Sequence, residues 1–97
     1  MRALLLACLL ASPAAALAQG TCLPHDDMAA HLAAGWGEAR RSIALDSAAA
    51  VVETYANPLT GTWTLVVTQP GGPSCMVASG DAYEEVDDAL PPADAPA

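Results

Sequence analysis

An export leader followed by two cysteines restricts what this 97-residue chain can fold into. Arg2 supplies a short positive segment, residues 3–11 form an unbroken apolar run, and Ala16-Leu17-Ala18 has the small-x-small form of a cleavage site. The apolar run is shorter than the roughly 20 residues that cross a bilayer. We therefore predict a signal peptide over residues 1–18, cleaved between Ala18 and Gln19, in preference to a retained anchor helix. The mature chain then has no membrane segment.

Two cysteines remain once Cys8 has left with the leader. An exported protein meets an oxidising compartment, where paired thiols form disulfides, and Cys22 and Cys75 allow one intramolecular pairing. A chain this short buries a small core and gains much from a crosslink. The chain has no C-x-x-C motif and no Lys to activate a thiol. We therefore predict a structural Cys22–Cys75 disulfide rather than a redox-active pair.

Helical spacing of apolar residues follows the first of these cysteines. Met28, Leu32 and Trp36 recur every four residues, which predicts an amphipathic helix over about residues 26–39. Asp26 precedes this stripe and can accept the free N–H groups of the first turn, so we expect it to cap the helix.

Four later segments have the alternation or composition of strands: residues 42–45, 48–56, 62–69 and 74–79. Within residues 48–56 the run of Ala favours a helix and the segment Val-Val-Glu-Thr-Tyr favours a strand. We prefer the strand, because a turn and a clear strand follow directly.

The segment 62–69 shows the clearest alternation in the chain. Trp63, Leu65 and Val67 fall on one side, and Thr62, Thr64 and Thr68 fall on the other side. We expect the apolar side, together with Ile43 and Leu45, to pack against the helix and the threonine side to face solvent. Both Trp36 and Trp63 are in phase with an apolar stripe and are expected in the core.

Together these elements predict an α+β domain over residues 19–80, in which one N-terminal helix packs on a three- or four-stranded antiparallel sheet with one disulfide. Residues 81–97 differ in kind, because they carry six acidic residues, no basic residue and several prolines. This composition predicts a disordered acidic tail that keeps the protein soluble. The alternative is a tail that docks onto a basic partner.

The charge of the chain excludes several classes of partner. Its net charge is −8 and it contains three Arg and no Lys, whereas nucleic acid and anionic membranes require a basic face.

No G-x-S-x-G elbow or phosphate-binding glycine loop is present, and the adjacent acidic pairs lie in the tail, where catalytic geometry is not fixed. We predict no enzymatic activity and no cofactor.

One cluster of residues has the chemistry of a metal site: Cys22, His25, Asp26, Asp27 and His31, with Cys75 if the fold brings it close. Oxidised cysteines do not ligate zinc, so the disulfide argues against the full set. Metal binding by His25 and His31 with nearby carboxylates stays as the alternative function. The favoured prediction is an exported, periplasmic or secreted, non-enzymatic interaction domain with an unknown protein partner.

Three short motifs carry a resemblance to known proteins. They are G-T-W-T at residues 61–64, P-x-G-x-S-C at residues 70–75 and A-S-G at residues 78–80. In this respect the chain resembles small uncharacterised exported proteobacterial proteins, over about residues 22–83. The resemblance implies export and the Cys22–Cys75 pairing, and it implies no catalytic or binding residue.

Overall fold

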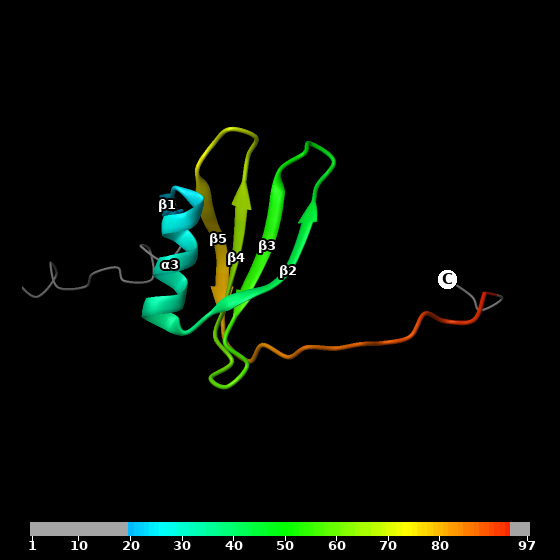
Figure 1. The fold of residues 1–97 in the computed structure, drawn as a ribbon. Helices are drawn as coiled ribbons and strands as arrows, with labels where there is room; N and C mark the ends of the chain where they lie inside the picture. The colour runs from blue at the N-terminus through cyan, green and yellow to red at the C-terminus, as the bar shows by residue number, and fades with distance from the viewer. Residues whose placement is uncertain (1–19, 94–97) are drawn as a thin grey trace, which may run out of the picture.

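The computed structural model describes residues 20–93, and one helix packs on one face of a five-stranded antiparallel sheet (Figure 1). The elements in chain order are β1 (Cys22–Leu23), α3 (His25–Trp36), β2 (Ala39–Leu45), β3 (Val51–Ala56), β4 (Trp63–Thr68) and β5 (Ser74–Gly80). The strands lie side by side in the order β1-β5-β4-β3-β2. The predicted α+β class is confirmed, with five strands rather than three or four because the short β1 also pairs. The predicted signal peptide over residues 1–18 and its cleavage site at Ala18 and Gln19 lie outside the described residues.

The predicted disulfide fastens the start of the domain to the sheet. Cys22 of β1 and Cys75 of β5 are directly opposed partners, with Cα atoms 4.0 Å apart, and they are joined by a disulfide. Only Leu23 and Pro24 separate Cys22 from the first residue of α3. The crosslink therefore holds the N-terminal end of the helix beside β5.

The helix begins and ends differently from the prediction. It spans His25–Trp36 and is shorter than predicted at its C-terminal end, and Pro24 rather than Asp26 occupies the N-cap, with no side-chain capping bond. Gly37 ends the helix in a left-handed conformation (φ 64°), and two backbone bonds, from Gly37 and Glu38 to the last turn, close it. This sharp turn sends the chain straight into β2.

The face of the sheet that we expected to be exposed to solvent packs against the helix. Val66 of β4 is fully buried among the core residues, and its neighbour Thr64 is 4% exposed. Because side chains alternate along a strand, Leu65 and Val67 lie on the opposite face, where they are half-buried. The prediction that Trp63, Leu65 and Val67 pack against the helix is therefore wrong. The prediction that the threonine side faces solvent is also wrong for Thr64.

The core between α3 and the sheet is small. Its buried hydrophobic cluster consists of Met28, Leu32, Tyr55, Val66 and Met76. Met28 and Leu32 confirm two of the three residues of the predicted helical stripe, whereas Trp36 is outside the core, and the other three members of the cluster come from β3, β4 and β5. The core is thus built from the centre of the sheet and the middle of the helix.

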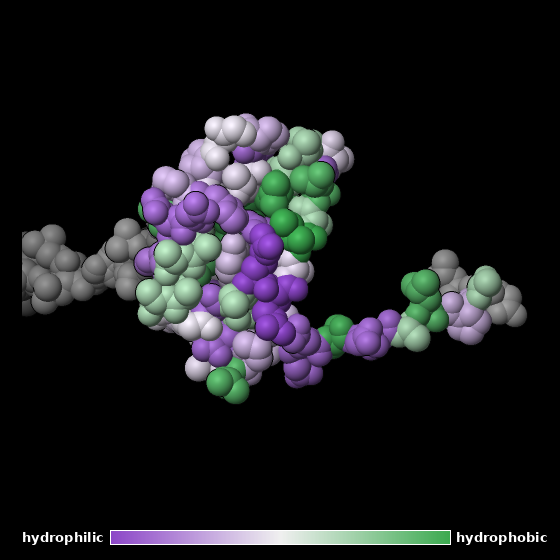
Figure 2. All heavy atoms as spheres, viewed as in Figure 1, coloured by the Kyte–Doolittle hydropathy of each residue, from purple (hydrophilic) through white to green (hydrophobic). Residues whose placement is uncertain are grey.

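The predicted core residues on β2 are exposed instead. Ile43 is 57% exposed and Leu45 is 69% exposed. In Figure 1, β2 lies at the edge of the sheet away from most of α3, and Figure 2 shows a hydrophobic patch at this edge. The helix therefore does not reach far enough along β2 to cover these side chains.

The ambiguous segment 48–56 is resolved as a strand. Residues Val51–Ala56 form β3, which pairs with β2 on one side and β4 on the other. The preference for a strand is confirmed, and the preceding alanines belong to the turn before it. Among the described residues, no helix is long and apolar enough to cross a membrane.

Residues beyond β5 remain attached to the domain before the chain extends away. The Asp81 carbonyl accepts a bond from the indole N–H of Trp63 at 3.2 Å, and the Tyr83 N–H donates to the Gly61 carbonyl at 2.9 Å. Glu85 forms an ion pair with Arg41 on β2. Contacts with the domain therefore continue for several residues into the predicted tail at 81–97.

Removing the disulfide is expected to destabilise the fold strongly. The two cysteines are 53 positions apart, and closing a loop of that length contributes about 4 kcal/mol in the chain-entropy model. The double variant Cys22→Ser/Cys75→Ser should lose about that free energy of unfolding in urea titration. An unchanged unfolding midpoint would contradict a structural role for the crosslink.

Candidate functional site

Within residues 20–93 two carboxylates are buried near the helix, and they differ in their hydrogen-bond partners. Glu53 of β3 is fully buried, and Glu38, just after α3, is 2% exposed. A buried carboxylate is costly unless hydrogen bonds or an opposite charge compensate it. The partners of each one therefore show which is structural and which faces a cavity.

Glu53 is surrounded by partners from three elements. His25 Nε2, at the start of α3, lies 2.9 Å from one carboxylate oxygen. Arg40 of β2 donates to the other oxygen at 3.1 Å, and the Tyr55 hydroxyl donates to it at 3.2 Å. This network joins the helix, β2 and β3 in the middle of the domain.

The network changes the acidity of its members. Burial alone would raise the pKa of Glu53, but the hydrogen bonds from His25 and Arg40 outweigh it, so the pKa lies below its usual 4.5. Burial and the neighbouring Glu53 charge raise the pKa of Tyr55. Glu53 is thus held as an anion by internal partners, and its carboxylate is already committed to binding the helix to the sheet.

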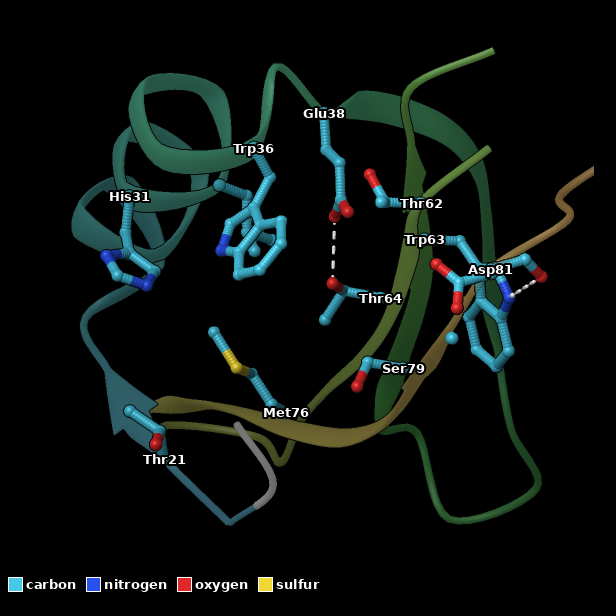
Figure 3. A pocket seen from close by; sticks show the side chains of 12 residues that line it. Thr21, His31, Trp36, Glu38, Thr62, Trp63, Thr64, Met76, Ser79 and Asp81 are labelled. Atoms are coloured by element: carbon cyan, nitrogen blue, oxygen red, sulfur yellow. Dashed lines mark hydrogen bonds between the residues drawn. The ribbon is translucent and has the colours of Figure 1, made fainter. Parts of the chain in front are cut away.

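A pocket of about 630 Å³ opens beside this network, between the C-terminal half of α3 and the ends of β4 and β5 (Figure 3). The helix contributes His31, Leu32 and Trp36 to its lining. The sheet contributes residues of β4 and β5, among them Thr64 and Met76. A concave, mostly apolar cavity of this size is typical of ligand sites, and it is the candidate site of this domain.

Glu38 is a buried acidic residue in the lining of the pocket. The left-handed turn at Gly37 places it there, and a Cβ at Gly37 would lie 2.7 Å from the Asn57 side chain, so the turn tolerates no larger residue without movement. The Glu38 carboxylate accepts one hydrogen bond, from the Thr64 hydroxyl at 2.8 Å. No ion pair involves it among the described residues.

Two tryptophans line the pocket instead of filling the core, so the expectation that both are core residues is wrong. Trp36 is 54% exposed at the end of α3. Trp63 lies against Gly80, whose missing side chain makes room for the ring, because a Cβ there would be 3.0 Å from the indole. In Figure 3 the Trp36 ring lies beside Glu38, whereas the Trp63 ring lies across the ribbons of β4 and β5, next to Asp81.

The residues singled out for metal binding are not brought together. Cys22 is in the disulfide, His25 bonds Glu53, and His31 lines the pocket. Asp26 lies 3.9 Å from the other ring nitrogen of His25. Within residues 20–93, no three His, Cys, Asp or Glu side chains are grouped in a way that could hold a metal ion.

Sequence reasoning missed Glu38 and Glu53, which turn out to be the two central polar residues. Glu53 carried a weak signal, since it is a lone acid within an apolar strand segment. Glu38 carried a signal too, because a helix-ending Gly directly precedes it. Neither signal identifies the partners, which come from distant parts of the chain.

Comparison with known proteins does not assign a function to this chain. No family model, curated protein or solved structure gives a significant match to the chain. The resemblance to small exported proteobacterial proteins therefore stays a prediction.

Replacing Glu53 is expected to lower the stability of the fold and to reduce the dependence of that stability on acid pH. The variant Glu53→Gln leaves His25 and Arg40 without their counter-charge, which should cost about 1–3 kcal/mol of unfolding free energy.

The acid response follows from the lowered pKa of Glu53. A carboxyl with a lower pKa when folded stabilises above its unfolded pKa and loses that contribution as pH falls through the folded value. The wild type should therefore lose stability below about pH 4.5 more steeply than Glu53→Gln, as measured by urea unfolding across acid pH. Parallel curves would show that Glu53 is not held as an anion.

Proposed function

We propose that the protein is an exported, non-enzymatic interaction domain that binds a partner in the pocket between α3 and the sheet. The observation that carries this proposal is the exposed indole of Trp36 at the pocket. Trp36 is 54% exposed beside a cavity of about 630 Å³, and exposed apolar surface of this kind marks interaction sites. Tryptophan is also a frequent anchor residue where proteins bind one another.

The arrangement of polar groups supports binding rather than catalysis. Nucleophilic catalysis needs a nucleophile within hydrogen-bond reach of a base. His31 and Ser79 both line the pocket, but no hydrogen bond joins them in the described part of the chain. The Glu53 carboxylate has several hydrogen bonds, and they join the helix, β2 and β3, so their role is structural.

Export to the periplasm or the medium is supported by two features. The N-terminal sequence has the form of a signal peptide, and the disulfide suits an oxidising compartment. The acidic charge makes basic partners the favoured ones and nucleic acid an unfavourable one.

Site-directed photo-crosslinking tests this proposal in cells that produce the chain with its own leader. A benzoyl-phenylalanine at position 36 should form a discrete adduct with a partner, identified by mass spectrometry. The same group at position 59 serves as the matched control, because Leu59 is 96% exposed and lies in the loop between β3 and β4. Equal adducts from both positions, or none from position 36, would contradict a binding role for the pocket.

A further inference from the structure

The pocket carries negative charge and no compensating positive charge. Glu38 and Asp81 line it, and His31 is the remaining titratable side chain of the lining. Among residues 20–93 the two arginines are both on β2, where one pairs with Glu53 and the other pairs with Glu85. The charge needed to balance Glu38 is therefore not supplied by the described domain.

Glu38 differs from Glu53 in its partners. The residue is 2% exposed, and among residues 20–93 one hydrogen bond, from Thr64, reaches its carboxylate. Glu53, buried to a similar degree, has three donors including Arg40. A cation entering the pocket would give Glu38 the kind of partner that Glu53 already has, in a site where the low dielectric strengthens the pairing.

The indole of Trp36 favours the same class of ligand. Figure 3 shows this ring beside the Glu38 side chain, on the side of β4 to which Thr64 points. The face of an indole attracts cations, and Trp is the strongest side chain in this respect. A guanidinium is planar, so it can stack on an indole while its N–H groups bond a carboxylate, which a compact ammonium cannot do equally well.

The open edge of β5 next to the pocket suits an extended peptide. Strand β1 pairs with β5 only at Ser74 and Cys75, and within the described residues no strand pairs with this edge beyond Met76. Ser79 and Gly80, which follow along the same strand, line the pocket. Unpaired backbone groups at a sheet edge can accept an added strand, with side chains entering adjacent pockets.

We infer that the pocket binds the guanidinium group of an arginine on an extended segment of a partner protein, with Glu38 as its counter-ion and the indole of Trp36 as its aromatic wall. The inference rests on the proposed binding function and names the chemistry of its ligand. The net charge of −8 would attract such a basic segment over a longer range.

Peptide titration of the exported protein, followed by tryptophan fluorescence and calorimetry, tests the inference. The probe is the capped tripeptide Ala-Arg-Ala, and its control is the same peptide with citrulline, which has the shape of arginine without the charge. We expect the arginine peptide to bind about tenfold more tightly. Capped arginine amide, which lacks the flanking residues, should bind more weakly than the tripeptide.

Two variants test whether the preference for arginine over citrulline arises in the pocket. Glu38→Gln keeps an acceptor for Thr64 and should remove the preference for arginine over citrulline. Asp88→Asn makes the same change of charge at an exposed position of the extended C-terminal segment and should leave the preference intact. An equal effect of both variants would overturn the role of Glu38.

Other outcomes separate this inference from the proposed function. Equal binding of the arginine and citrulline peptides, or no binding of either while the adduct from position 36 persists, would overturn the inference and leave the binding function standing. Arginine amide that binds as tightly as the tripeptide would overturn the peptide source in favour of a free guanidinium compound. Loss of both the peptide binding and the adduct would overturn the proposed function itself.

Discussion

One short helix covering a five-stranded sheet is the arrangement on which the whole structure depends. A helix of 12 residues is about 18 Å long, so it cannot cover the full face of the sheet. Its N-terminal end is fixed by the Cys22–Cys75 disulfide and by the contact of His25 with Glu53. Its C-terminal end therefore extends over the ends of β4 and β5, and the space that remains is the pocket.

The contrast between two buried carboxylates connects this arrangement to function. Glu53 has donors from the helix, β2 and its own strand, and its role is to hold those elements together. Glu38 is equally hidden from solvent but has one hydroxyl donor and faces the cavity. The domain thus satisfies one acid completely and leaves the other able to take a charged partner, with Trp36 beside it.

The fold class and the disulfide were predictable from the sequence, because helical spacing and a single cysteine pair are local or unambiguous signals. The buried face of β4 was not predictable. Alternation divides a strand into two faces, but which face is covered depends on where the helix lies. The face of Val66 also carries Thr64 and Thr68, so it is less hydrophobic than the face of Leu65. The pocket was missed for a related reason: Trp36 has the spacing of a core residue, but it lies in the last turn, where the helix has passed the core.

The central claim is that the disulfide holds α3 in place over the sheet, and amide hydrogen exchange of the oxidised and reduced protein tests it most directly. We predict that reduction speeds exchange in α3 and β1 far more than at the centre of β3 and β4, because the helix loses its attachment to β5 while the central strands keep their partners on both sides. Unchanged protection of α3 after reduction would contradict it.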